Sequence, residues 1–337
     1  MPKKINIKLS ICIATLNRAP YLERLLDLIT QQYQNGIEIV IVDGASTDNT
    51  SDVVNNIKKN FSGIQYIKLE EKGGIDRDFS LAVEKANGEF CWLLPDDDLI
   101  KPNAIENILA MIDHETNLIV VNSEIRSEDL GVLLKQKTVS IDDDINYQQQ
   151  DYDQFFTLIA NYMSFIGCVV IRKSLWDERQ KERYFGSWFV HMGVIFQDYI
   201  NGVKIMAEPL ITIRYGNASW TSKSFEISLF KWPELIWSFQ TISDDAKLNV
   251  VKRHPWKSLA RLLLFRARGV YGKIEYQRYL KYKLSFSQKP LFYLGAILPG
   301  ILLNSFFLIY FNVMRFYYED WKIHVFDLKS SKYYYKA

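Results

Sequence analysis

Three consecutive carboxylates follow a short apolar run in the first third of the chain. Asp96, Asp97 and Asp98 come directly after the run Trp92-Leu93-Leu94-Pro95. Adjacent carboxylates repel one another, so a fold that gathers them at the end of a strand needs a cation to neutralise them. The triplet therefore predicts a site for a divalent cation and for the diphosphate that such a cation binds.

A second acid ends another apolar run. Asp43 follows the run 37–42 and precedes the turn-forming stretch 44–50. Parallel strands deliver the residues at their carboxyl ends to the same edge of a sheet. We therefore expect Asp43 and the acid triplet to face one crevice.

The first 120 residues alternate short β-branched runs with helical patterns, which is typical of βαβ units on a parallel sheet. The pattern predicts strands near 9–14, 37–43, 64–69, 89–94 and 118–122, with helices at 20–32, 47–60, 75–86 and 102–112 between them. The acid-rich stretch 123–151, with Asp142-Asp143-Asp144, reads as a solvated loop. An aromatic helical stretch (151–163), a strand (165–171), a helix through about Ile200 and a closing strand (211–214) are expected to follow.

The length, the composition and the cysteine content indicate a globular protein of a reducing compartment. The chain has 337 residues, 48% of them hydrophobic, which is ample for a packed core. Its three cysteines lie inside apolar runs without metal-binding spacing, which favours a reducing cytoplasm. The apolar run near the N-terminus is too short for a signal peptide or a membrane span.

The C-terminal part carries a different charge. Residues 252–289 hold eleven basic residues and one acid, Glu275, although the net charge of the whole chain is only +2. The stretch Leu291–Met314 that follows has no charged residue, but Pro299-Gly300 interrupts it. A membrane span, a re-entrant hairpin in one leaflet and a pair of core helices all remain open; the basic neighbour favours the membrane. Nucleic acid is not expected as a partner, because no recognition motif is present.

Four ordered motifs carry a resemblance to a known family. They are Ser10-Ile11-Cys12-Ile13-Ala14-Thr15-Leu16-Asn17-Arg18, Val42-Asp43-Gly44-Ala45-Ser46-Thr47-Asp48-Asn49-Thr50, Ala86-Asn87-Gly88-Glu89-Phe90 and Leu94-Pro95-Asp96-Asp97-Asp98. Over residues 7–215 the chain resembles a family-2 glycosyltransferase with a GT-A fold. Within that family it looks most like bacterial abequosyltransferase-type enzymes of O-antigen and surface-polysaccharide synthesis.

The resemblance implies a nucleotide-sugar site. Asp43 would accept a hydrogen bond from the base, and Trp220 would stack on a sugar from a flexible lid. The other residues implied at the donor are Thr15, Asn17, Asp76, Arg77, Asp96 and Arg214.

The resemblance also implies a Mg²⁺ or Mn²⁺ ion at the acid triplet. Two registers are open: Asp96 and Asp98 form the ligand pair, or Asp97 is the main ligand with Asp96 near the ribose. Asp97 and Asp98 are the members that we expect to bind the ion.

The catalytic base departs from the family pattern. Members carry a Glu-Asp pair about a dozen residues before a Gly-x-Lys-Ile turn, which here is Gly202-Val203-Lys204-Ile205. The corresponding positions hold Val190 and His191. An unperturbed imidazole has a pKa near 6.5, so His191 is the expected base, with Asp198 as a second candidate.

The predicted organisation is a GT-A catalytic domain (1–215), a helical basic region (216–290) and an apolar membrane-associated segment with the tail (291–337). The expected reaction moves a sugar, for example a 3,6-dideoxyhexose such as abequose, from a CDP- or other NDP-sugar to a polyprenyl-diphosphate-linked glycan. It would take place at the cytoplasmic face of the bacterial inner membrane.

Three alternatives are weighed against this. A nucleotidyltransferase would show a Gly-rich phosphate loop after the first strand, which is missing. A processive polysaccharide synthase would show several long spans and a Gln-x-x-Arg-Trp-like motif, and neither is seen. A non-catalytic sugar-binding protein on the same scaffold remains open because the Glu-Asp pair is absent.

Overall fold

The computed structural model describes residues 7–216, 223–314 and 321–335. They fold into two compact units. Unit 1 comprises the described residues up to Ile125, Gln136–Arg214 and Phe239–Ala246, and unit 2 comprises Arg126–Lys135, Tyr215–Ser238 and the described residues from Lys247 onwards. Segments of the two units alternate along the chain. A division of the sequence at single positions does not predict this arrangement.

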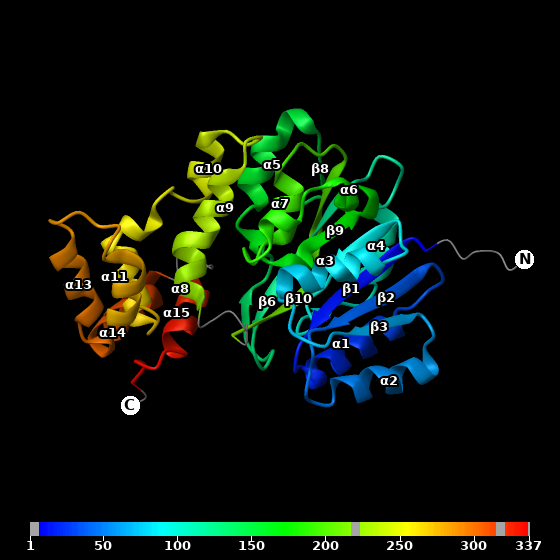
Figure 1. Ribbon diagram of the computed structural model, residues 1–337, viewed down its shortest axis with the longest axis horizontal. Coiled ribbons are helices and arrows are strands. Elements are labelled where there is room, and N and C mark those ends of the chain that lie inside the picture. Colours follow the sequence, from blue (N-terminus) through cyan, green and yellow to red (C-terminus); the bar gives the residue numbers. More distant parts are fainter. Residues whose placement is uncertain (1–6, 217–222, 315–320, 336–337) are drawn as a thin grey trace, which may run out of the picture. The chain divides into compact units, whose positions relative to one another are not determined.

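Unit 1 is built on a mixed sheet with helices on both faces (Figure 1). The strands of the sheet are β1 (Leu9–Thr15), β2 (Ile37–Asp43), β3 (Ile64–Lys68), β4 (Phe90–Leu93), β5 (Leu99–Ile100), β6 (Leu118–Ser127), β7 (Leu133–Lys135), β8 (Ile145–Tyr147), β9 (Val169–Arg172) and β10 (Val203–Tyr215). The residues of β7 belong to unit 2. The helices up to β10 are α1 (Ala19–Gln31), α2 (Thr50–Asn60), α3 (Ile75–Lys85), α4 (Ala104–Met111), α5 (Tyr152–Ile159), α6 (Lys173–Glu178) and α7 (Val190–Phe196).

The strand order is β3-β2-β1-β4-β9-β6-β10-β5, with β7 paired to β6 and β8 paired to β10. β1 pairs in parallel with β2 and β4, and β2 with β3, so the predicted βαβ half is confirmed. β9 runs antiparallel to both β4 and β6. Mixed α/β architecture with a largely parallel core is therefore the fold class that the sequence predicts.

The core of unit 1 explains why these runs become strands. β1 and β2 are buried along their whole length, so both faces need apolar side chains and the runs are nearly continuous. Leu22, Leu25 and Ile29 of α1 pack with one face of these strands, together with residues of α2 and α4. Figure 1 shows α3 on the side of β1 and β2 opposite to α1 and α2.

Three predicted strands differ from the structure. β6 runs on to Ser127, into the stretch 123–151 that was predicted as a loop and that also holds β7 and β8. The stretch 165–171 begins with a 3-10 turn at Ile166–Cys168, because the Phe165 ring folds back over Gly167 and leaves no room for a Cβ there. The closing strand is longer than predicted: β10 continues through Pro209, which lies between the segment paired with β8 and the segment paired with β5. All three cysteines are free and buried.

The Ala86-Asn87-Gly88-Glu89-Phe90 motif joins α3 to β4. The buried carboxylate of Glu38 accepts hydrogen bonds from the Ser10 hydroxyl (2.6 Å) and from Asn87. Gly88 lies so close to β1 that a Cβ there would stand 2.7 Å from the Ser10 backbone nitrogen. The motif therefore has a packing role, since only glycine allows this approach.

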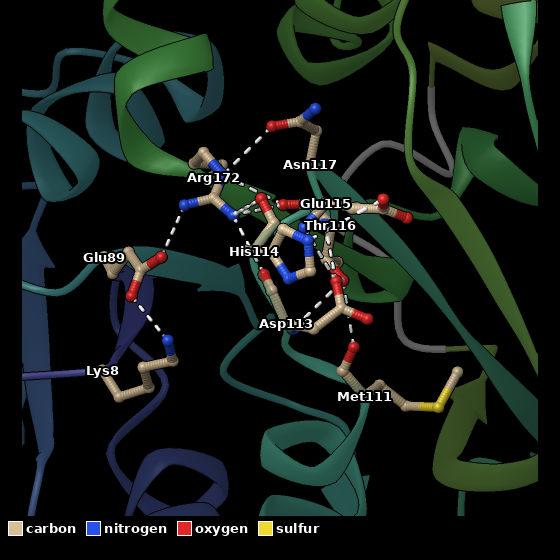
Figure 2. Close-up of polar contacts among 9 residues, drawn as sticks. All are labelled: Lys8, Glu89, Met111, Asp113, His114, Glu115, Thr116, Asn117 and Arg172. Atoms are coloured by element: carbon tan, nitrogen blue, oxygen red, sulfur yellow. Dashed lines mark hydrogen bonds and ion pairs between the residues drawn. The ribbon is translucent and has the colours of Figure 1, made fainter.

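A polar network closes the end of the sheet where β1 and β4 begin (Figure 2). The Arg172 guanidinium donates to Glu89, to the Asn117 side chain and to the backbone carbonyls of Asp113, His114 and Thr116. Lys8 pairs with the other Glu89 oxygen at 2.6 Å. These contacts tie β1, β4, β6 and β9 together at the end opposite to Asp43 and the acid triplet.

Unit 2 is helical. Its helices include α8 (Ser224–Glu226), α9 (Trp232–Ser238), α11 (Leu259–Ala267), α12 (Lys273–Glu275), α13 (Lys289–Ile297), α14 (Gly300–Met314) and α15 (Trp321–Lys329), and α10 (Asp244–Val250) joins the two units in the chain. One apolar cluster gathers residues of α8, α11 and α13 around Tyr271, and a second gathers residues of α11, α14 and α15.

Within the described residues, no single helix combines the length and hydropathy of a membrane span. The pair α13 and α14 passes that test when the two helices are taken together, with a bend of 88° between them.

Candidate active site

The acid triplet and the loop after β1 meet at the carboxyl end of the sheet in unit 1. Thr15, the last residue of β1, donates its hydroxyl proton to the Asp96 carboxylate at 2.7 Å. Arg18, three residues further on, forms an ion pair with Asp97 and lies 3.8 Å from Asp96. The predicted neighbours Thr15 and Asp96 are thus brought together, and Arg18 joins them.

The three carboxylates have different surroundings. Asp96 and Asp98 are buried, whereas Asp97 is partly exposed. Burial, reinforced by the Asp97 charge, raises the pKa of Asp96 to about 7. The same two causes raise the pKa of Asp98 well above its ordinary value. The present neighbours therefore do not fully stabilise the ionised form of Asp96 and Asp98, and a cation bound beside them would favour that form.

Two arginines flank the triplet and share one aromatic ring. The guanidinium groups of Arg18 and Arg214 lie 5.7 and 5.2 Å from the centre of the Tyr21 ring. Burial alone would lower the pKa of Arg18, but the charges of Asp97 and Asp96 outweigh it and raise the pKa. Arg214 also donates its Nε proton to the Asp97 carbonyl at 3.1 Å. The sequence predicted a role for Arg214, while Arg18 and Tyr21 were missed.

The residues present fit a divalent cation at Asp97. Among the described residues, no three His, Cys, Asp or Glu side chains converge as a complete metal-binding cluster. Mg²⁺ does not need one, since one or two carboxylates with water and phosphate oxygens are enough. Asp97 offers a partly exposed carboxylate, with Asp96 beside it. The Asp98 carboxylate, also predicted as a ligand, is buried and accepts the backbone N–H of Arg214 at 2.8 Å, so it holds β10 in place. Its role as a metal ligand stays a prediction.

The loops after β1 and β2 interlock. Asn17, at a φ of 54°, accepts backbone N–H bonds from Thr47 (2.7 Å) and Asp48 (3.3 Å), and its own N–H binds the Ser46 hydroxyl. Ala45 has a φ of 71°, a conformation that costs energy for any residue with a Cβ. The hydrogen bonds between the two loops hold both residues in this conformation. The structure gives Asn17 the role of ordering the loop.

Asp43 lies at the end of this crevice and has internal partners. One carboxylate oxygen accepts the Ser46 N–H at 2.7 Å and the other accepts the Tyr66 hydroxyl at 2.5 Å. Burial and the Asp43 bond raise the pKa of Tyr66 to about 12, so the phenol stays protonated. Since Asp43 is fully buried, direct contact with a base requires these partners to move. Tyr66, which the sequence did not single out, is the partly exposed member of the pair.

A buried carboxyl that the sequence analysis missed lies next to Asp43. Asp78 of α3 is 6% exposed, and its Oδ1 has no hydrogen-bond partner in the described structure. Burial raises its pKa to about 6, with Asp43 adding to the effect. Gly44 and Gly73 lie against it, and a Cβ at Gly73 would stand 2.4 Å from Oδ1. The two glycines come from separate loops, so no pattern in the sequence singles out Asp78.

The two charged residues predicted at the start of α3 have separate surroundings. The Asp76 carboxylate accepts backbone N–H bonds from Gly186 (2.8 Å), Trp188 (3.0 Å) and Val190 (3.1 Å). Asp76 therefore holds the loop that leads into α7, and its contact with the donor stays a prediction. Arg77 is exposed and lies 5.3 Å from the centre of the Phe185 ring, which leaves its head group available to an anion.

The predicted base, His191, is not supported by its surroundings. The ring is fully buried in α7, and its Nε2 donates to the Met163 carbonyl at 2.6 Å. Burial lowers its pKa to about 4, so the imidazole is neutral near pH 7 and is shielded from any acceptor hydroxyl. The second candidate, Asp198, is exposed, lies 3.6 Å from Arg179 and does not contact the acid triplet. Trp220 lies outside the described residues.

Comparisons with known proteins agree with this geometry. The chain is similar to the abequosyltransferase RfbV of Salmonella typhimurium, with 26% identity over 229 residues, 64% of this chain and 69% of that protein. It is also similar to the GalNAc(5)-diNAcBac-PP-undecaprenol beta-1,3-glucosyltransferase of Campylobacter jejuni, with 26% identity over 182 residues, 53% of this chain and 57% of the relative.

Solved structures share the fold. The crystal structure of residues 1–349 of TarS from S. aureus has a TM-score of 0.56 and 15% identity, and the match covers 96% of this chain and 91% of that one. The same part of TarS has been solved with UDP and with UDP-GlcNAc. The GT-A fold is therefore confirmed.

The model of the family described as "Glycosyl transferase family 2" matches residues 10–179, just over half of the chain, and this range contains Asp43 and the acid triplet. The alternative of a nucleotidyltransferase is thereby set aside. The protein belongs to glycosyl transferase family 2 and is a glycosyltransferase.

Proposed function

We propose that this protein transfers a sugar from a nucleoside diphosphate sugar to a lipid-linked glycan. The observation that carries the proposal is the contact of Thr15 and Arg18 with Asp96 and Asp97 at the carboxyl ends of β1 and β4. Ligands of open α/β sheets bind in the crevice at that end. The complexes of TarS with UDP and UDP-GlcNAc support a nucleotide sugar as the class of donor.

We assign the base of the nucleotide to the end of the crevice that holds Asp43, Tyr66 and Asp78. The Tyr66 hydroxyl is partly exposed and can both donate and accept, as can a protonated Asp78 carboxyl. Asn17 keeps the loop after β2 in place beside them. Hydrogen-bonding groups of both kinds at this point suit the mixed donor and acceptor edge of a pyrimidine.

We assign the diphosphate to the other end. Arg18 and Arg214 are held on the Tyr21 ring next to the acid triplet, so their positive charges face the place where the leaving group departs. Asp97, with Asp96 beside it, would hold Mg²⁺ or Mn²⁺. A divalent cation bound there stabilises the charge that develops on the departing nucleoside diphosphate. Arg77 is a further anion contact at the start of α3.

The sugar and the acceptor follow from the relatives. Similarity to an abequosyltransferase favours a 3,6-dideoxyhexose such as abequose as the transferred sugar. The name of the Campylobacter relative contains undecaprenol joined through PP, which favours a polyprenyl-diphosphate-linked glycan as acceptor. We therefore place the reaction in O-antigen or surface-polysaccharide synthesis, at the cytoplasmic face of the membrane that holds such a lipid.

Metal-dependent hydrolysis of the donor tests the proposal without knowledge of the acceptor. We expect turnover of at least one of CDP-abequose, UDP-N-acetylglucosamine and a GDP-hexose in the presence of Mg²⁺ or Mn²⁺, and its loss with a chelator. Asp97→Asn should lower the rate about 100-fold, because the carboxylate that holds the cation is gone. Asp143→Asn is the matched control, since Asp143 is the middle acid of the exposed second triplet.

Each result bears on a separate part of the proposal. Preference for CDP-abequose would support the dideoxyhexose assignment, and preference for another sugar would remove it. Equal activity of Asp97→Asn and Asp143→Asn would contradict the cation role of Asp97. Turnover that persists in chelator would remove the metal altogether.

A further inference from the structure

The helices α13 and α14 of unit 2 expose large apolar side chains. Leu291 and Leu294 of α13 and Ile301, Leu302, Phe306 and Ile309 of α14 are each at least half exposed. We call these six residues the α13–α14 surface. Single exposed apolar residues are ordinary, but six large ones on two successive helices mark an interaction site.

The exposed side of α14 is not needed by the fold of unit 2. The opposite side already packs inward, with Leu303, Phe307 and Phe311 in contact with the cluster formed by α11 and α15. Buried Asn304 donates to the carbonyls of Ala267 (3.1 Å) and Leu328 (2.9 Å) and so ties α14 to both neighbours. A helix that is apolar on both sides requires an apolar environment on the second side as well.

The bend between α13 and α14 is held by specific contacts. Arg266 donates its Nε proton to the Leu298 carbonyl at 2.9 Å, at the end of α13. Gly300 lies against the Tyr333 ring, where a Cβ would approach to 2.4 Å. At ~1.5 Å per residue the helices are ~13 and ~22 Å long. A fixed bend of 88° between helices of that length suits insertion into one leaflet, whose hydrocarbon layer is ~15 Å thick.

The segment before α13 combines exposed aromatic and basic side chains. Tyr282 and Phe286 are 85% and 91% exposed, and Lys281 and Lys283 are exposed beside Tyr282. Exposed aromatic rings next to lysines are typical of the membrane interface, where the rings enter the headgroup layer and the ammonium groups bind lipid phosphate. Residues 252–289 carry eleven basic residues and one acid, so the charge near the apolar surface is strongly positive.

We propose that the α13–α14 surface inserts into one leaflet of an anionic lipid bilayer, with residues 281–289 in the headgroup layer. Positive charge next to the apolar surface attracts anionic lipid and would repel a second copy of the same chain. The reason for such binding, which is to hold the enzyme where a lipid-linked acceptor lies, rests on the proposed function. Binding itself depends on unit 2 alone.

Vesicle co-sedimentation of the full chain tests the surface. We expect binding to vesicles of phosphatidylethanolamine with phosphatidylglycerol, and binding at least about tenfold weaker to phosphatidylcholine alone or in high salt. The triple variant Leu302→Asn, Phe306→Asn and Ile309→Asn should bind about 100-fold more weakly, because three apolar side chains no longer leave water. Val132→Asn with Leu248→Asn is the matched control, since both residues are exposed and lie outside the surface.

Depth is measured with a fluorophore at Ser305→Cys, an exposed position on α14, because the native cysteines are buried. Quenching by a nitroxide on the upper acyl chain should exceed quenching by one near the chain terminus. Stronger quenching by the deep nitroxide would overturn the one-leaflet inference. Equal vesicle binding by the triple variant and the control would overturn the surface itself.

Two further measurements separate the inference from its rivals. Light scattering that shows a dimer of the full chain, lost in the triple variant, together with no vesicle binding would assign the surface to a second copy and overturn the proposal. Without vesicles, the rate of donor hydrolysis should be the same in the triple variant and the unmodified protein. Vesicle binding without any donor hydrolysis would contradict the proposed function and leave the membrane inference standing.

Discussion

The three acids of the triplet are adjacent in sequence but have different contacts and roles. Asp96 is held by Thr15, Asp97 is paired with Arg18, and Asp98 fixes the backbone of Arg214. Only Asp97 combines a partly exposed carboxylate with a position beside both arginines. This is the carboxylate that we propose as the ligand of the cation.

The buried imidazole of His191 gives a pH-dependent prediction. In the unfolded chain the ring takes up a proton near its usual pKa of 6.5, whereas in the folded chain it resists protonation down to about 4. Between those values the unfolded state therefore binds more protons, and the free energy of unfolding falls as the pH falls. The loss should approach ~1.4 kcal/mol per pH unit in that window.

His191→Gln tests this by urea unfolding at several pH values. Glutamine keeps an N–H for the Met163 carbonyl but does not titrate, so the difference from the unmodified protein should shrink or reverse as the pH falls. His114→Gln is the control, because that ring is 90% exposed and should leave the pH dependence unchanged. A constant offset between His191→Gln and the unmodified protein over the whole window would show that His191 titrates normally.

For single residues, the sequence indicated which side chains could do chemistry, but it did not indicate which side chains and carbonyls they contact. Acids that end apolar runs, such as Asp43 and Asp96, were recognised because strand ends are visible in one dimension. The burial of His191 was not, since a histidine of ordinary pKa and one locked on a carbonyl 28 positions away look the same in sequence. Asp78 was missed for the same reason: its character comes from two glycines in separate loops.

Among the elements, α3 connects the site to the later part of unit 1. Asp76 in its first turn accepts three backbone N–H groups from the segment that leads into α7. Gly186 and Trp188 in that segment have φ values of 84° and 76°, so the loop needs these bonds to keep its shape. The position of α7 therefore depends on one carboxylate of another helix.

Asp76→Ala should destabilise this connection. Hydrogen bonds to a charged group contribute about 1.5–3 kcal/mol each, and losing three that act together should lower the free energy of unfolding by about 3 kcal/mol. Hydrogen exchange of residues 185–196 should rise, while β1 to β4 stay protected.

Asp52→Ala is the matched control for Asp76→Ala. Asp52 is an exposed acid in the first turn of α2, a helix of the same length, and its removal should change stability by less than about 0.5 kcal/mol. If Asp76→Ala weakens donor binding without raising exchange in 185–196, the predicted donor contact of Asp76 is correct after all.

The bounds of a helix or strand were predictable where its apolar residues follow one clear pattern. They were not predictable where they depend on contacts with residues distant in sequence. β1 and β2 are continuous apolar runs because both faces are buried, so their bounds were predicted closely. β9 starts late because residues 166–168 form a 3-10 turn, with the Phe165 ring against Gly167. β10 crosses a proline that normally ends a strand, and its two paired segments on either side make that tolerable.

For the whole molecule, the important feature is that each unit has its own core. The core of unit 1 contains residues of the sheet, α1, α2 and α4, whereas unit 2 has separate clusters around Tyr271 and around Phe311. Separate cores allow one unit to lose stability without the other.

Asn304→Ala tests this independence. The change removes the side-chain amide that donates to the carbonyls of Ala267 and Leu328, which keep only the hydroxyl and the backbone N–H of Ser331 as described donors. The lost bonds should cost unit 2 about 1–3 kcal/mol. Hydrogen exchange should rise in α11, α14 and α15 and stay unchanged in β1 to β4. Asn312→Ala is the control, because its side chain donates only to a carbonyl within α14, at Leu308. Increased exchange throughout β1 to β4 would show that the two units unfold together.

The strand order also has a consequence during synthesis on the ribosome. β5 pairs with Ile211 and Thr212 of β10, about 110 residues later, and β6 lies between β9 and β10. At about 5–20 residues per second, the β10 side of β6 waits several seconds for its partner strand. During that time the growing chain presents a long apolar edge, which is the kind of surface that chaperones recognise and that other chains join. Completion of the sheet is thus set by the rate of translation through β10.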